Sequence, residues 1–282
     1  MFRVSSLGFR VKTRNPKRVR ERATMKVLIH AVSKHFETSH GATRALGGIS
    51  FDVNDREFFG VIGPTGCGKT TLLQIIAGLE TPTLGSVRFD GEQRTKSMVA
   101  MVFQESALMP WRTVEENVPL GDEFRLEQPS VLKRVSKAFL DLVKLGDFAN
   151  SRPYELSGGM KQKVAIARAL ANDPEVILMD EPFANLDAQT RLLMREELLR
   201  IWEQERKTVI LVTHNLDEAV MLCDRIAVLS AAPAMVKKII TVDIPRPRTM
   251  QSTRTPEFGR CVDEIWNLLR HDVDQAQRDS HS

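Results

Sequence analysis

The amino-acid sequence predicts an α/β domain with a mainly parallel sheet, a small antiparallel β part and a helical insertion. Three observations lead to this fold class. A compact apolar run at 57–62 ends directly in a glycine-rich loop at 63–70, and a helical pattern follows the loop. From residue 157 onward, helical stretches alternate with short apolar runs, which is typical of a parallel sheet covered by helices. Between these regions, residues 105–152 carry a helical period.

The strands of the first half differ in how they are expected to be buried. Residues 26–32 form the first apolar segment, and residues 51–53 alternate apolar and polar side chains. The run at 57–62 resembles a strand that is buried on both faces of a parallel sheet. Residues 85–90 and 98–103 also have the composition of strands.

The helices are recognised by apolar residues that recur every three or four positions. A helix at 70–77 follows the glycine loop, and Gly78 is a natural end for it. The clearest helical period within the insertion covers 131–145. The second half then continues with a helix from Ser157, a strand at 176–179, a helix at 189–203 and a strand at 208–212.

The end of the chain has a different character. After Thr241 the sequence contains Pro245, Pro247 and Pro256, and residues 246–282 are expected to form an extended arm and a short helix. The short helix should lie around 265–269, where the pattern is amphipathic.

Composition excludes a membrane-spanning chain. A bilayer-crossing helix needs about 20 apolar residues, and the longest apolar run, 226–236, is interrupted by Ser230 and Pro233. The three cysteines have neither paired nor metal-ligand spacing, which favours a reducing cytosol.

Residues 1–22 contain eight basic residues and one acid, a net charge of +7, whereas the whole chain carries +4. The rest of the chain is therefore mildly acidic. Three interpretations of this tail are open: a disordered arm that contacts anionic lipid or nucleic acid, an organelle transit peptide, or an extension upstream of a true start at Met25. We favour a mis-assigned or unstructured extension over 1–24, because Met25 opens the first convincing strand.

The loop from Gly63 to Thr70 matches the P-loop template, G-x-x-x-x-G-K-[ST], at every fixed position. Its backbone amides and the positive end of the following helix would point at phosphate oxygens. Lys69 would bridge the β- and γ-phosphates, and the Thr70 hydroxyl would bind Mg²⁺. The expected nucleotide-binding set is Gly63, Pro64, Thr65, Gly66, Cys67, Gly68, Lys69, Thr70 and Thr71.

A second set of reactive residues follows the apolar strand at 176–179. Asp180 would reach the edge of the sheet beside the phosphates and hold Mg²⁺ through water. Glu181 would lie one residue further on, near the γ-phosphate, where a carboxylate can orient and deprotonate the attacking water.

The sequence Leu-Ser-Gly-Gly-Met at 156–160 predicts a further anion site. Ser157 is a good N-cap residue, and Gly158 and Gly159 expose the first amides of a helix. Because the chain already has a P-loop, this second phosphate-binding segment needs a separate explanation.

In combination, these motifs resemble the ATP-binding-cassette (ABC) ATPases, a family with a P-loop core. The P-loop, Gln104, Leu-Ser-Gly-Gly-Met, Asp180-Glu181, Asn185-Leu-Asp187 and His214 stand in the family's order, and the resemblance covers about 26–241. It implies ATP and Mg²⁺ as ligands. It also implies two cassettes joined head to tail, so that each ATP lies between one P-loop and the partner's segment of Ser157, Gly158 and Gly159.

The resemblance also assigns roles to single positions. Phe36 looks like the aromatic residue that stacks on adenine, and Gln104 like the residue that couples Mg²⁺ and the attacking water to the helical insertion. Asp187 resembles the acid of the cross-dimer loop, and His214 the switch histidine on the γ-phosphate. The implied catalytic residues are Glu181, His214 and Gln104, and the implied metal set is Thr70, Gln104 and Asp180.

The resemblance further implies an organisation and a subfamily. Residues 25–245 would form the ATPase domain, with a helical subdomain at about 105–156. Pro110-Trp111-Arg112, together with the Leu-Ser-Gly-Gly-Met motif, is similar to importers of nitrate, sulfonate and taurine. Such an ATPase works as a dimer, and a homodimer is expected here. The dimer acts on a separate integral-membrane permease, which receives solute from a periplasmic or lipid-anchored binding protein.

In that subfamily, the ATPase is peripheral to the cytoplasmic face of the bacterial inner membrane, and Trp111 would anchor the permease. The alternative is an ABC ATPase that acts on nucleic acid or the ribosome, for which the basic tail would be suited. Such proteins usually carry tandem cassettes or long coiled-coil insertions, and this sequence has neither.

Overall fold

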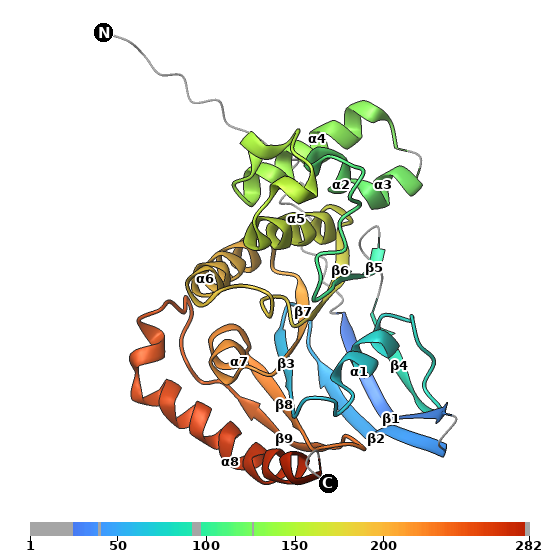
Figure 1. Cartoon of the computed structure of the whole chain (residues 1–282), viewed down its shortest axis with the longest axis vertical. Coiled ribbons are helices and arrows are strands. Elements are labelled where there is room, and N and C mark those ends of the chain that lie inside the picture. Colours follow the sequence, from blue (N-terminus) through green and yellow to red (C-terminus); the bar gives the residue numbers. More distant parts are fainter. Residues whose placement is uncertain (1–24, 39–40, 92–96, 126, 280–282) are drawn as a thin grey trace.

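A computed structural model of the 282-residue chain describes residues 25–38, 41–91, 97–125 and 127–279. Within these ranges, a mainly parallel six-stranded sheet lies beside a three-stranded antiparallel sheet, with a group of helices at one end (Figure 1). The predicted α/β fold class is confirmed. The extension expected at 1–24 falls outside the described residues.

The strands of the main sheet are β3 (Phe58–Ile62), β5 (Ser97–Val102), β6 (Pro174–Asp180), β7 (Thr208–Thr213), β8 (Arg225–Leu229) and β9 (Val236–Thr241). They stand in the order β5-β6-β7-β3-β8-β9, and all neighbours are parallel except β8 and β9. Every residue of β3, β6 and β7 is buried, which explains their nearly continuous apolar sequences.

The antiparallel sheet contains β1 (Lys26–Thr38), β2 (Gly41–Val53) and β4 (Leu84–Asp90), in the order β2-β1-β4. Both β1 and β2 are longer than the segments 26–32 and 51–53 expected from the sequence. The first four residues of β2 are exposed, so no apolar alternation marks them, and pairing with β1 keeps them extended.

Helices cover the two faces of the main sheet. On one face lies α1 (Lys69–Ile76) with the antiparallel sheet, and on the other lie α6 (Ala188–Glu205), α7 (Leu216–Leu222) and α8 (Pro256–Asp279) (Figure 1). The side chains of β3 alternate between these faces. Phe58 and Ile62 belong to the core that includes α6 and α7, whereas Phe59 and Val61 belong to the core that includes α1.

Between β5 and β6 the described chain is helical, as the sequence predicts. The elements are α2 (Val114–Asn117), α3 (Leu120–Phe124), α4 (Pro129–Leu142), the short 3-10 turns Gly146–Phe148 and Pro153–Glu155, and α5 (Gly158–Ala171). α4 packs on α5, which joins the insertion to the main sheet. No helix in the described ranges has the length and apolar composition needed to cross a membrane.

Two features near the end of the chain differ from the expectation. The expectation of a short helix around 265–269 is wrong. The helix in this region, α8, begins at Pro256 and has 24 residues. Pro256 suits the first turn of a helix, and buried Phe258, Ile265 and Leu269 continue one face. The strands β8 and β9 were not expected, since the apolar run at 226–236 contains a turn between two short strands.

Candidate active site

The P-loop connects β3 to α1 at the carboxyl edge of the main sheet. Gly68 precedes the helix with φ at 107°, a left-handed value that glycine adopts without strain. A Cβ atom at this position would lie 3.0 Å from the carbonyl oxygen of Ala45 and 3.0 Å from a methyl carbon of Leu46. Both neighbours belong to β2, so the antiparallel sheet packs closely against the P-loop at Gly68.

The Lys69 side chain is held inside the P-loop. Only 6% of the residue is exposed, and its ammonium donates hydrogen bonds to the carbonyl oxygens of Gly63 at 2.9 Å and Pro64 at 2.8 Å. These bonds use two of the three ammonium hydrogens, so the side chain can reach one further acceptor. A positive charge in this loop matches the position expected for a phosphate-binding lysine.

Thr70 and Asp180 bring two oxygen ligands together. Asp180 ends the buried strand β6, and its Oδ1 accepts a hydrogen bond from the Thr70 hydroxyl at 3.3 Å. Burial raises the pKa of Asp180, while the hydrogen bond from Thr70 opposes that shift. A hydroxyl beside a carboxylate is a donor set that suits Mg²⁺, so these two residues fit the expected metal site.

Gln104 lies at the same edge of the sheet but is not joined to that pair. It follows β5, the neighbour of β6, and its backbone carbonyl accepts a bond from the Asn185 side chain at 3.4 Å. In the described ranges, no hydrogen bond connects Gln104 to Thr70 or Asp180. Its part in the metal set therefore stays a prediction.

Glu181 and His214 form a direct contact. Nδ1 of His214 lies 2.9 Å from Oε2 of Glu181. The two residues follow β6 and β7, neighbouring parallel strands that pair as far as Asp180 and Val212. Glu181 has φ at 44°, an uncommon left-handed value for a residue with a side chain, and its N–H donates to the carbonyl oxygen of Val212 at 2.9 Å. Backbone strain of this kind is often found at functional sites.

The second anion-binding segment starts α5. The hydroxyl of Ser157 accepts a hydrogen bond from the Met160 N–H at 3.3 Å and caps the helix. A Cβ atom on Gly159 would lie 2.7 Å from the Thr190 methyl carbon, so the start of α5 is in close contact with α6. Gly158, the first residue of α5, is exposed between these two contacts.

Asp187 caps α6 and links it to the same contact. Its Oδ1 accepts hydrogen bonds from the N–H groups of Gln189 at 3.1 Å and Thr190 at 3.0 Å, and the bonds from Thr190 lower the pKa of Asp187. Thr190 therefore touches both Gly159 and Asp187. In the described part of the chain, no hydrogen bond joins this pair of helix starts to the P-loop, Glu181 or His214.

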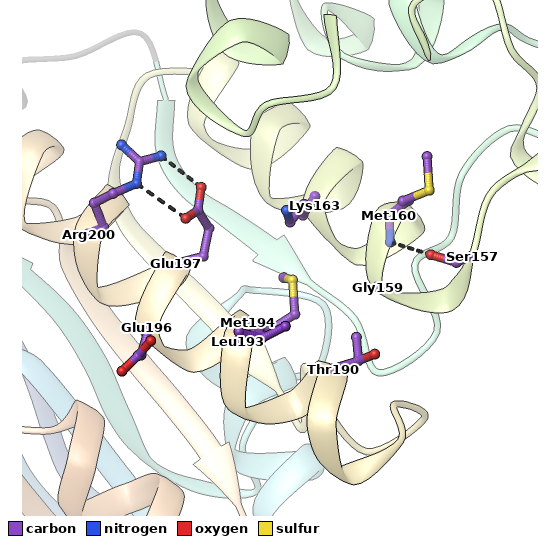
Figure 2. A pocket seen from close by; sticks show the side chains of 10 residues that line it. All are labelled: Ser157, Gly159, Met160, Lys163, Thr190, Leu193, Met194, Glu196, Glu197 and Arg200. Carbon is purple, nitrogen blue, oxygen red and sulfur yellow. Dashed lines mark hydrogen bonds and ion pairs between the residues drawn. The ribbon is translucent and has the colours of Figure 1, made fainter. Parts of the chain in front are cut away.

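Behind these helix starts, α5 and α6 enclose a pocket of about 440 Å³ (Figure 2). Its wall includes Ser157, Met160 and Lys163 from α5, and Leu193 and Arg200 from α6. Arg200 is paired with Glu197 at 2.8 Å, and Figure 2 shows this pair at the opposite end of the pocket from Ser157.

Phe36 lies in β1, half-buried, opposite Thr43 in β2. Lys34 Nζ lies 4.9 Å from the centre of its ring. Thr43 stands two residues before Ala45, which approaches the P-loop at Gly68. Phe36 therefore lies on the strand that pairs with β2, the strand that approaches the P-loop, and in the described residues no contact joins its ring to the loop.

Arg168 links α5 to the segment after β5, a contact that the sequence does not predict. From α5, its guanidinium donates to the carbonyl oxygens of Ser106 at 2.8 Å and Ala107 at 2.7 Å. It therefore attaches the segment after Gln104 to the helix that Ser157 begins. The signal in the sequence is weak, because an arginine among alanines in a helix indicates only a partly exposed face.

A P-loop between strand and helix, two carboxylates after the neighbouring strand and a histidine that contacts one of them can hold and hydrolyse a nucleoside triphosphate. The fold and the site therefore define a P-loop ATPase. The family model described as ABC transporter matches residues 46–184.

Relatives narrow the class further. The chain is 48% identical over 257 residues to an uncharacterised ABC transporter ATP-binding protein of Methanocaldococcus jannaschii, covering 90% of this chain and 95% of that protein. It is 45% identical over 240 residues to the aliphatic sulfonates import ATP-binding protein SsuB of Bacillus cereus, covering 84% and 94%. The chain belongs to the ABC transporter ATP-binding family, and its activity is the hydrolysis of ATP.

Solved structures agree with this family. A dimeric ATP-binding cassette in a post-hydrolysis state, bound to ADP and Pi, matches with a TM-score of 0.68 and 31% identity. The match covers 78% of this chain and 100% of that chain. The predicted ABC ATPase fold is thereby confirmed.

Proposed function

We propose that this chain is the ATPase subunit of an importer that takes up a small anionic solute of the nitrate, sulfonate or taurine type. Two copies would pair head to tail at the cytoplasmic face of a bacterial inner membrane. A separate permease would cross the membrane, and a binding protein would deliver the solute. Support comes from the relatives named for aliphatic sulfonate import and from the Trp111 region.

The head-to-tail pairing rests on the two separate groups of site residues. The P-loop lies with Asp180, Glu181 and His214, whereas Ser157 and Asp187 begin helices that have no hydrogen bond to that group in the described ranges. A second copy would bring its Ser157 helix to the nucleotide on the first P-loop. The solved relative that is dimeric and holds ADP and Pi supports this proposal.

Each site residue then has a defined task in hydrolysis. Lys69 would bind the phosphates. Thr70 would hold Mg²⁺ directly and Asp180 through water, with Gln104 as a further proposed ligand. Bound Mg²⁺ neutralises charge on the phosphates. Glu181 accepts a proton as water oxygen bonds to the γ-phosphorus, and the bond from that phosphorus to the β-γ bridging oxygen breaks. His214 keeps the Glu181 carboxylate oriented through the 2.9 Å contact.

The exposed aromatic residues of the insertion provide a surface for the permease. Trp111 is 68% exposed and lies shortly before α2, and Tyr154 is 73% exposed and lies in the 3-10 turn Pro153–Glu155. The Arg152 guanidinium donates to the carbonyl oxygen of Trp111, which joins their two segments. Exposed aromatic side chains of this kind are common anchors in protein interfaces.

The substitution Glu181→Gln tests the catalytic proposal. It keeps the size and the hydrogen-bonding capacity of the side chain but removes the base, so ATP binding should persist while kcat falls by about 10²–10⁴-fold. ATP binding and steady-state phosphate release would be measured for both proteins. Glu203→Gln, on α6, is the matched control and should keep normal turnover. Normal turnover by Glu181→Gln would reject Glu181 as the base.

The cargo is tested in the assembled transporter. We expect the ATPase rate of the complex with its permease to rise when the binding protein is loaded with an alkanesulfonate, taurine or nitrate. Each solute would be supplied separately, with a neutral sugar as the control. Stimulation by the sugar alone would contradict the anionic cargo and would leave the ATPase assignment intact.

A further inference from the structure

Residues 242–248, which follow β9, form an arm that runs along the end of α7. The backbone N–H of Val242 donates to the carbonyl oxygen of Asp224 at 2.9 Å, so the arm begins against a residue two positions beyond the end of α7. At the other end of the arm, Arg248 is only 4% exposed. This arm lies outside the catalytic group described above.

Arg248 is buried in a ring of backbone carbonyls. Its guanidinium donates to carbonyl oxygens of Cys223 at 2.6 Å, Val220 at 3.0 Å, Met221 at 3.4 Å, Val242 at 3.0 Å and Ile244 at 3.0 Å. Three of these oxygens belong to the carboxyl end of α7, where carbonyls lack partners within the helix. Arg248 thus joins the arm to α7 through several bonds, and Arg246 adds one more, from its guanidinium to the carbonyl oxygen of Leu222 at 2.7 Å.

The charge of Arg248 suits this position. Burial lowers its pKa to about 10, so it remains protonated at neutral pH. In the described part of the chain, no salt bridge joins it to a carboxylate. The negative end of a helix dipole and the carbonyl oxygens stabilise a cation there.

A second arginine of the arm connects it to the strand that leads into the P-loop. Arg246 donates to the Asp224 carboxylate at 2.8 Å, and its guanidinium lies 4.3 Å from the centre of the Trp202 ring. The other Asp224 oxygen accepts a hydrogen bond from the N–H of Phe58 at 3.0 Å. The arm is therefore fixed to the first residue of β3 as well as to α7.

The opposite end of α7 adjoins the histidine of the site. Asn215 caps the helix by accepting a bond from the Glu218 N–H at 3.0 Å, and His214 immediately precedes it. α7 has only seven residues, and a helix this short is marginal unless its ends and faces are held. A shift of α7 would therefore move His214 relative to Glu181.

We propose that Arg248 is a positioning residue for ATP hydrolysis, because it fixes the carboxyl end of α7 and thereby holds His214 against Glu181. This inference rests on the proposed role of His214. The arm contributes no group to the reaction itself. It sets the position of the helix that carries the histidine contact.

Arg248→Met tests the inference, because it keeps a long side chain and removes all the donors. We expect kcat to fall about tenfold while KM for ATP stays within about twofold, measured per folded molecule by single-turnover and steady-state assays. Arg248→Lys keeps the charge with fewer donors and should restore part of the rate. The matched control is Arg260→Met on α8, whose side chain is 72% exposed and should be neutral.

A double-mutant cycle with His214→Ala separates positioning from stability. If Arg248 acts through His214, Arg248→Met should change the residual rate by less than about twofold in the His214→Ala background. Equal tenfold losses in both backgrounds, or a normal kcat in Arg248→Met, would overturn the inference. If Arg248→Met does not fold, the same double-mutant cycle is measured with Arg248→Lys, and the same comparison of rates supports or overturns the inference. Full activity of His214→Ala alone would instead overturn the proposed role of His214.

Discussion

Glu218 is a single carboxylate buried within α7, next to the histidine loop. It is 4% exposed, and its Oε2 lies 3.6 Å from Nη2 of Arg195, which is equally buried. Burial raises the pKa of Glu218 to about 7, and this effect exceeds the opposing influence of Arg195. The buried pair therefore contains a group whose charge changes near neutral pH.

The raised pKa of Glu218 makes the contribution of this residue to stability depend on pH. Between about pH 4.5 and 7 the folded chain binds a proton at Glu218 that the unfolded chain has released, so the contribution of Glu218 to the free energy of unfolding should fall as pH rises and level off above 7. Glu218→Gln removes this titration. The difference in unfolding free energy between wild type and Glu218→Gln should change by about 3 kcal/mol between pH 4.5 and 8, measured by chemical denaturation. A difference independent of pH would contradict the burial of an ionisable carboxylate.

At the scale of elements, the contact between the starts of α5 and α6 makes a sharp packing prediction. Gly159→Ala places a Cβ atom 2.7 Å from the Thr190 methyl carbon, whereas at Gly158 the nearest atom, a methyl carbon of Leu186, would be 3.4 Å away. Gly159→Ala should therefore destabilise the chain by about 1–3 kcal/mol, and Gly158→Ala should change it little. Denaturant unfolding without nucleotide measures both.

Removal of the Thr190 methyl group provides the control for the predicted effect of Gly159→Ala. Thr190→Ser keeps the hydroxyl and deletes the methyl carbon that Gly159→Ala would strike. The double variant should recover most of the lost stability, because the two residues are in direct contact. Additive losses would show that the strain arises elsewhere.

The elements that the sequence predicts well are those defined by neighbouring residues. Examples are the strand before the P-loop, the helix after it and the Ser157 cap. In each case a pattern of adjacent residues indicates both the structure and its role. In contrast, the first half of β2 and the strand β9 depend on pairing with distant segments, and they carry little apolar pattern of their own. The sequence does not reveal the length of α8, because a proline at position 256 is typical of an extended arm. In the structure, Pro256 occupies the first turn of the helix.

At the scale of the whole molecule, the sequence predicts which residues have reactive chemistry but not what holds them. The contact between Glu181 and His214 joins residues 33 positions apart. The position of Glu181 after an apolar strand indicates its role and the family resemblance indicates that of His214, but neither predicts that the two side chains touch. Arg248 and Arg168 hold the site through carbonyl oxygens far along the chain. Every residue type has a backbone carbonyl oxygen, so the sequence cannot indicate which carbonyls accept these bonds. Such links could be found only in the structure.

The central proposal is that each ATP lies between the P-loop of one copy and the Ser157 segment of another. Lys69→Ala should inactivate every P-loop, and Ser157→Arg should block every partner-facing helix start, so each variant alone should be inactive. In an equimolar mixture, half of the dimers are mixed and each mixed dimer has one intact site.

The most direct measurement is the ATPase rate of that mixture compared with the two variants assayed separately. We expect activity to return to about a quarter of the wild-type rate, since one site in two is intact in half of the dimers. A mixture no more active than the separate variants would contradict a site shared between two copies.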